Sequence, residues 1–194
     1  INLTSAVIML PAKTQIYINF KFSGMIMDVK PALEKLEDNK DFKKWQHKSK
    51  GTYFSYAFKI PQEMQEDEWQ FGFYNPKNDK ITTFVIAGGN VNVRHEEDVF
   101  KLEETKINKV DIEKIKLSFD SVMQKANEFQ QKNFPKDRSI KTIAILQNLA
   151  ELGNIWNITY VTEAFNTLNI KIDALSGKIL EHNLSSIFSF RQKE

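Results

Sequence analysis

The chain has 194 residues, of which 41% are hydrophobic and 27% are charged, and its formal net charge is +2. A chain of this length buries about 70% of its surface on folding, enough for one sizeable core or two small ones. The composition excludes disordered, collagen-like and coiled-coil proteins. No apolar run reaches the roughly 18 residues that a membrane-spanning helix needs. We therefore expect a globular fold, and the 15 phenylalanines favour one that contains strands.

Charge and cysteine content narrow the functional classes. Lys and Arg number 27 against 25 Asp and Glu, too small an excess for a protein that binds nucleic acid. There is no cysteine, which excludes disulfides and thiolate chemistry. The chain begins with Ile1 rather than Met. We therefore expect a processed or trimmed form, with any targeting segment or membrane anchor upstream of residue 1.

The first half predicts a strand, a helical segment and then further strands. Residues 15–22 alternate apolar and polar side chains, the period-2 pattern of a half-buried strand. Asp28 and Pro31 suit the start of a helix, and apolar residues at helical spacing predict one kinked helix or two short ones over 28–48. Apolar runs bounded by turn residues then predict strands at 53–60, 68–74, 80–87 and 90–94.

The second half has the same order of elements. Apolar residues from Ile112 to Phe129 recur every three or four positions, and Asn108 is a suitable N-cap, so we expect a long helix over 108–133. Strands are predicted after it at 141–149, 154–162, 167–174 and 178–181. A helix followed by several strands thus occurs twice, which indicates an internal repeat at the level of element order.

This order predicts the fold class. A helix with one apolar stripe must be covered by a sheet with one apolar face, and alternating strands joined by short turns supply an antiparallel sheet of that kind. We therefore predict an α+β protein of two units, residues 1–100 and 101–194. Each unit would consist of one helix packed on a three- or four-stranded antiparallel sheet.

The segment from Leu168 to Leu180 has a more specific pattern: an alternating strand, Asp173, the pair Ser176-Gly177, and a short strand that begins at Lys178. It resembles the terminal hairpin of PepSY domains, which are cystatin-like. The likeness covers about 108–182, and residues 28–100 match as a divergent copy. The resemblance implies an extracytoplasmic, often membrane-anchored module that binds or restrains other proteins, peptidases among them, and that has no enzymatic activity.

Motifs for catalysis and cofactor binding are absent from the sequence, which has no nucleophile elbow, Ser-x-x-Lys, P-loop or dinucleotide fingerprint. His47, His95 and His182 lie in three different predicted elements, and the acidic residues beside His95 are its neighbours in a loop, where ligands rarely converge on one ion. We therefore predict no catalytic residue, no metal site and no cofactor. Asp173, Ser176 and Gly177 are expected to have a structural role in their turn.

Two groups of residues are candidates for binding. The lysines of residues 43–50, together with Trp45 and the following Tyr53, Phe54 and Tyr56, mix cations with aromatic side chains and could contact a nucleic-acid backbone and its bases or anionic lipid headgroups. The simpler interpretation is a helix end with Trp45 packed inward. A concave aromatic face of the sheet could hold a peptide or a small apolar ligand, and a sheet edge could accept a partner's strand. The candidates for this face are Trp69, Phe71, Phe73, Trp156 and Tyr160.

The predicted function is that of a non-catalytic, extracytoplasmic interaction or regulatory protein. We expect it to bind another protein, with a peptidase or a cell-envelope component as the candidate partner. The alternative is a carrier that holds a small ligand between helix and sheet, and a hydrolase ranks third. A cavity of a few hundred Å³ would favour the carrier. A filled core with an exposed apolar patch or an open edge strand would favour protein binding. The oligomeric state stays open at this point.

Overall fold

The structure is a computed structural model that describes residues 27–61, 68–87, 90–98 and 106–188. Its helices are α1 (Val29–Asp38), α2 (Lys40–Lys48) and α3 (Phe119–Asn133), with a 3-10 turn, η1, at Ile112–Lys114. Its strands are β1 (Tyr53–Lys59), β2 (Trp69–Asn75), β3 (Lys80–Ala87), β4 (Asn90–Asp98), β5 (Ser139–Leu149), β6 (Gly153–Thr162), β7 (Asn166–Asp173) and β8 (Ile179–Ser186).

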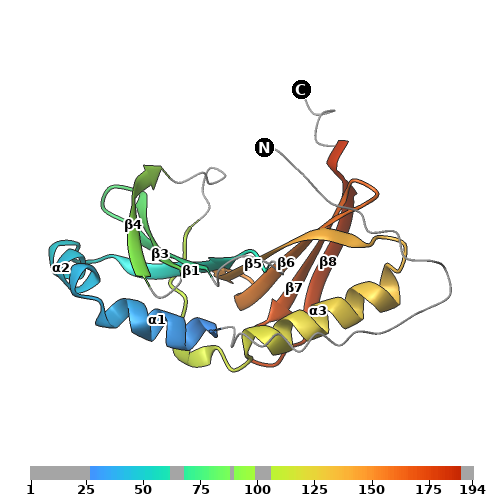
Figure 1. Cartoon of the computed structure of the whole chain (residues 1–194), viewed down its shortest axis with the longest axis horizontal. Coiled ribbons are helices and arrows are strands. Elements are labelled where there is room, and N and C mark those ends of the chain that lie inside the picture. Colours follow the sequence, from blue (N-terminus) through green and yellow to red (C-terminus); the bar gives the residue numbers. More distant parts are fainter. Residues whose placement is uncertain (1–26, 62–67, 88–89, 99–105, 189–194) are drawn as a thin grey trace.

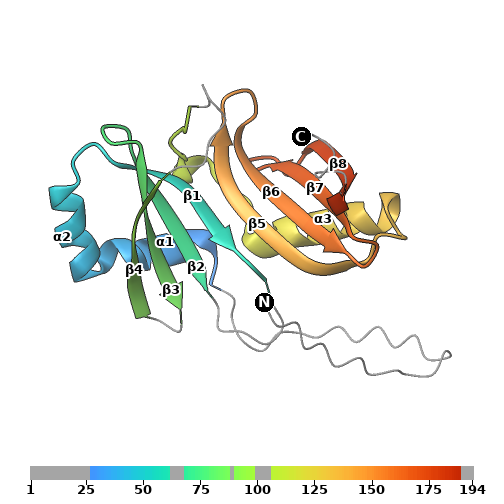
Figure 2. The same ribbon diagram turned by 90° about the horizontal axis from the view of Figure 1, so that it is seen from above.

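All eight strands form one continuous antiparallel sheet in the order β4-β3-β2-β1-β5-β6-β7-β8 (Figure 1). Helices α1 and α3 lie on one face of this sheet. Figure 2 looks onto the opposite face, and there α1 lies behind β2 to β4 and α3 behind β5 to β8. No helix among the described residues covers this second face.

The single sheet overturns the predicted fold class. Residues 56–59 of β1 pair with residues 144–147 of β5, so the strands expected to form two separate sheets are hydrogen-bonded into one. The prediction of two separate helix-on-sheet units is therefore wrong. The physical reason is that a sheet edge presents unpaired N–H and C=O groups, and pairing two edges satisfies both. The predicted boundary at residues 100 and 101 and the predicted strand at 15–22 lie outside the described residues.

The predicted helical segment over 28–48 consists of two helices. Helix α1 begins at its N-cap Asp28 and buries Val29, Ala32, Leu33 and Leu36. It ends at Asn39, whose extended backbone breaks the helix while its side chain accepts hydrogen bonds from the amides of Asp41 and Phe42. One asparagine thus ends α1 and caps α2.

Helix α3 is shorter than predicted, because it begins after Ser118 rather than at Asn108. Ile112 and Ile115 have helical spacing in the sequence, but they pack on the core from the short 3-10 turn η1 and the residue that follows it, in a segment without α-helix. Backbone groups of that segment find partners on strands or strand ends: Val110 donates to Phe54 O (2.9 Å), and Lys116 donates to Ala174 O (3.1 Å). Some of the backbone donors of this segment therefore find hydrogen-bond partners without forming a helix.

The core lies between the helices and the sheet face that they cover. Along β6, Trp156, Ile158 and Tyr160 point into this core, while Asn157 and Thr159 lie on the helix-free face, as the period of two requires. Gly72 of β2 lies on the helix-free face, and the ring of Tyr56 from β1 occupies the space where a side chain at this position would lie.

Candidate functional site

The five aromatic residues predicted to form a binding face lie in the core. Each side chain is less than 10% exposed and packs on the side of the sheet that the helices cover. Trp69 Nε1 donates a hydrogen bond to the carbonyl oxygen of Met27 (2.7 Å), and the Tyr160 hydroxyl donates to Asn127 Oδ1 (2.6 Å). Burial raises the pKa of the Tyr160 hydroxyl above its ordinary value. In this structure, Trp69, Phe71, Phe73, Trp156 and Tyr160 therefore join the sheet to the helices.

The basic segment around α2 has the arrangement of a helix end. The ring centroid of Trp45 lies 4.9 Å from that of Phe84, inside an aromatic cluster that holds α2 on the sheet. Lys43 forms an exposed ion pair with Asp38 (3.2 Å). The tryptophan packs inward, as the simpler interpretation of this segment expects.

The turn between β7 and β8 is closed by local contacts. Asp173 Oδ1 accepts a hydrogen bond from the Ser176 backbone amide (2.6 Å) and another from the Ser176 hydroxyl, and these bonds lower the pKa of the Asp173 carboxyl. Gly177 has a φ of 76°, and a Cβ there would lie 2.6 Å from Lys125 Cε. This tight turn fixes where β8 begins.

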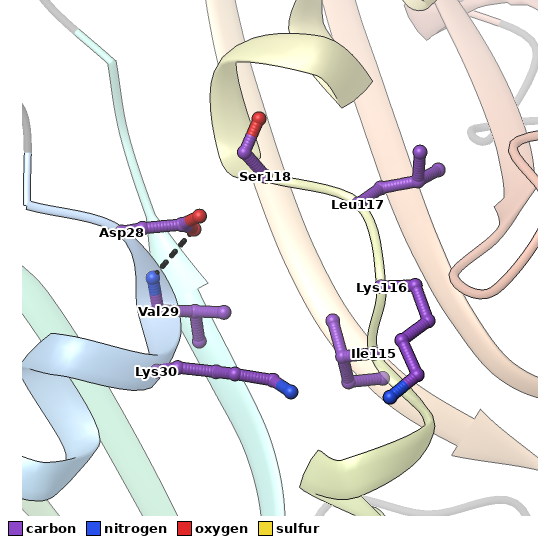
Figure 3. A pocket seen from close by; sticks show the side chains of 7 residues that line it. All are labelled: Asp28, Val29, Lys30, Ile115, Lys116, Leu117 and Ser118. Atoms are coloured by element: carbon purple, nitrogen blue, oxygen red, sulfur yellow. Dashed lines mark hydrogen bonds between the residues drawn. The ribbon is translucent and has the colours of Figure 1, made fainter.

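A pocket of about 210 Å³ lies between the start of α1 and the segment that leads into α3 (Figure 3). Asp28 and Lys30 line it from α1, and Lys116 and Ser118 line it from the facing segment. Sites for small molecules usually have a volume of roughly 300–1,000 Å³ and enclose most of the ligand. This pocket is smaller, and no strand residue lines it, so it does not match the site between helix and sheet that the small-ligand carrier requires.

Histidines do not gather with acidic residues in the part of the chain that the structure describes, where no group of three His, Asp or Glu side chains could hold a metal ion. The His182 ring packs against two rings at the end of α3: its centroid lies 5.1 Å from that of Phe129 and 5.7 Å from that of Phe134. His47 is exposed on α2, and the side chain of His95 lies outside the described residues.

Exposed apolar side chains gather instead on β8 and near its two ends. Six large hydrophobic side chains are exposed among the described residues, and four of them lie on β8 or close to its two ends. A fifth, Phe165 in the turn between β6 and β7, has its ring centroid 5.7 Å from that of Phe188. The sixth, Ile140, is on β5. We name as the β8 strip the residues Phe165, Leu175, Leu184, Ile187 and Phe188.

Phe165 has an unusual backbone conformation. Its φ is 55°, in the left-handed region that disfavours a bulky side chain by roughly 1–2 kcal/mol. Its amide donates to Thr162 O (3.0 Å), and its carbonyl oxygen accepts from the Ile187 amide (2.9 Å). These bonds hold the ring in place, 59% exposed. A strained residue that presents an apolar ring to solvent indicates a functional constraint.

Strand β8 is also an outer edge of the sheet, as Figures 1 and 2 show. Its one acidic side chain, Glu181, is ion-paired with Lys171 of β7 (2.6 Å), and the strand contains no Lys, Arg or Pro. The sequence of the other edge strand, β4, ends in Arg94-His-Glu-Glu-Asp98. Charges and prolines are the usual protection of an edge against pairing. By this measure β8 is the less protected edge.

Sequence reasoning missed this site. Phe165 falls between the predicted strands 154–162 and 167–174, and a period of two identifies the face of a strand but not the exposure of a residue in a turn. The last predicted strand, 178–181, stops before Leu184, whereas β8 continues to Ser186. The available signal was a neutral strand followed directly by Ile187-Phe188.

Comparison with known proteins found no matching family model and no matching curated protein. Among solved structures, the fold is similar to that of a predicted lipoprotein from Clostridium difficile 630, with a TM-score of 0.52 and 13% sequence identity, over 82% of this chain and 94% of that one. At this identity the likeness shows a shared fold. The described part of the chain contains no helix both long and apolar enough to cross a membrane.

Proposed function

We propose that this chain is a non-catalytic, extracytoplasmic interaction module that binds another protein along β8. The observation that carries the proposal is that most of the exposed apolar side chains lie on or near the ends of β8, an edge strand with little charge. Exposed apolar patches with polar surroundings mark interaction sites. The resemblance to PepSY domains favours a peptidase or a cell-envelope component as the partner.

The mode of binding that fits this surface is the addition of a strand. An extended segment beside β8 would pair with its outward backbone groups, and its side chains would alternate between the two faces of the sheet. On the face covered by α3 they would meet Leu184 and His182, with Phe129 and Phe134 behind. On the helix-free face they would meet Glu181, Asn183 and Ser185. A segment with alternating apolar and polar residues is therefore the expected ligand.

The extracytoplasmic location is supported by two independent likenesses. One is the hairpin around Asp173 and Gly177, which resembles that of extracytoplasmic modules. The other is the fold shared with a predicted lipoprotein.

The test is affinity capture with the wild-type chain and with a Leu184→Lys variant, which places a charge on the exposed edge. Proteins that the wild type retains and the variant does not are identified by mass spectrometry, purified, and titrated against both chains. We expect at least one such protein, with an affinity at least tenfold lower for the variant. An Ile140→Lys variant is the matched control, because Ile140 is exposed but lies outside the β8 strip. If all captured proteins bind the three chains equally, β8 is not the binding surface.

A further inference from the structure

We propose that the partner which fits β8 best is a second copy of the chain, with the two β8 strands antiparallel across a two-fold axis. This inference rests on the proposed function, because it names the strand that the β8 edge accepts. The result would be one sheet that continues through both copies. A two-fold contact requires the same patch on both partners to be complementary to itself, so the residues of β8 can be examined for that property.

Strand β8 is complementary to itself in a register centred on Asn183. In this register Asn183 faces its own copy, His182 faces Leu184, and Glu181 faces Ser185. Like charges directly opposite each other would destabilise the pair, and this register has none. A register centred on Glu181 would place two carboxylates opposite each other. Charge therefore selects between these two alignments.

The polar row on the helix-free face supports the same register. Thr159 of β6, Asn169 of β7 and Asn183 of β8 are cross-strand neighbours, and Asn169 Nδ2 donates to Thr159 Oγ1 (2.9 Å). Pairing at Asn183 would continue this row without interruption into Asn183 and Asn169 of the second copy. Amide side chains donate and accept hydrogen bonds, so two facing asparagines can bond to each other.

The exposed apolar residues are accounted for by the same contact. Antiparallel pairing in this register brings Ile187, which follows β8 in one copy, opposite Ile179 at the start of β8 in the other, with Phe188 next to it at the same end. The exposed Leu175, in the turn before β8, would lie at the same end of the contact as the second copy's Phe188. Leu184 would be covered along the strand. One contact would thus remove from water most of the β8 strip.

The test uses the absence of cysteine from the chain, which lets a single introduced thiol report one distance. In the proposed register, the two Asn183 Cα atoms would be about 4.5–5.5 Å apart, within the range of a disulfide. The two Ser185 Cα atoms would be separated by four residues along the strands, roughly 14 Å. Asn183→Cys should therefore form a disulfide-linked dimer under mild oxidation, and Ser185→Cys, on the same strand and face, should not.

We expect at least ten times more covalent dimer from Asn183→Cys than from Ser185→Cys. Light scattering of the wild type at high micromolar concentration should give twice the chain mass of 22.6 kDa. Leu184→Lys should give the monomer mass with an unchanged circular dichroism spectrum. Equal cross-linking of both cysteine variants, or a monomeric wild type, would overturn the dimer. A different protein captured through β8 would then still support the proposed function, whereas loss of both results would remove the two proposals together.

Discussion

Asp28 connects the start of α1 to Phe119, the first residue of α3. One carboxylate oxygen, Oδ1, accepts hydrogen bonds from the amide of Val29 (2.7 Å) and from the amide of Phe119 (3.1 Å). The first amides of a helix have no partner within the helix, and its N-terminus carries a partial positive charge. A single carboxylate therefore serves two helix N-termini, and the Asp28–Phe119 bond joins residues that are 91 positions apart in the sequence.

Replacing Asp28 with alanine should lower the free energy of unfolding by about 2 kcal/mol, because loss of an N-cap costs roughly 0.5–2 kcal/mol and the charge is lost at both helices. Urea denaturation followed by circular dichroism measures the change. Asp28→Asn is the control, since it keeps an acceptor oxygen without the charge, and we expect it to lose less than about 1 kcal/mol. If Asp28→Ala has the same free energy of unfolding as the wild type, the shared cap contributes nothing to stability.

A second prediction concerns Tyr56 and Gly72, which are cross-strand neighbours on β1 and β2. The Tyr56 ring occupies the space that a Cβ at Gly72 would need, and its hydroxyl pairs with Thr83 Oγ1 (2.9 Å). Gly72→Ala must displace the ring, and we expect a loss of about 1–3 kcal/mol in the free energy of unfolding. In a Tyr56→Ala background the same change should cost much less. The double-mutant cycle gives the coupling, and additive losses would contradict the steric explanation.

The individual strands were predictable from sequence because their signal is local. Alternation along β6 and β7 needs only a few consecutive residues, and the predicted ranges fall close to the observed ones. The pairing of β1 with β5 was not predictable, since the two strands are far apart in sequence and neither pattern distinguishes a central strand from an edge. The same limit applies to β8, whose composition predicts a strand but not its place at the outer edge of the sheet.

The start of α3 shows a different limit. Ile112 and Ile115 have the spacing of a helix, yet their segment forms only the short 3-10 turn η1, and hydrogen bonds to distant backbone groups hold the residues on either side of it. The conformation of this segment is therefore set by its tertiary hydrogen bonds and not by the helical periodicity of its sequence. The exposed position of Phe165 was hidden for a related reason, because a positive φ in a phenylalanine has no signature in composition or periodicity.

Phe165→Gly separates backbone strain from binding. Glycine adopts a φ of 55° without strain, which offsets the loss of the contact with Phe188, so we expect stability to stay within about 1 kcal/mol of the wild type. Binding at β8, whether to a second copy or to another protein, should weaken at least tenfold because the ring is lost. Light scattering and titration measure these effects. Ile140→Ser, at the exposed position outside the β8 strip, should leave binding unchanged, and equal loss in both variants would contradict the assignment.

The last prediction follows from the buried hydroxyl of Tyr160, whose pKa burial raises above the ordinary value of about 10. Above pH 10 the unfolded chain loses this proton before the folded chain does, so the free energy of unfolding should fall as pH rises further. Tyr160→Phe cannot ionise, so its stability should fall less between pH 9 and 11, although it starts about 1 kcal/mol lower without the bond to Asn127. Urea midpoints across this range test the difference. Asn127→Ala keeps the ionisable hydroxyl and should retain the steep fall; the same slope in Tyr160→Phe would exclude Tyr160 as its source.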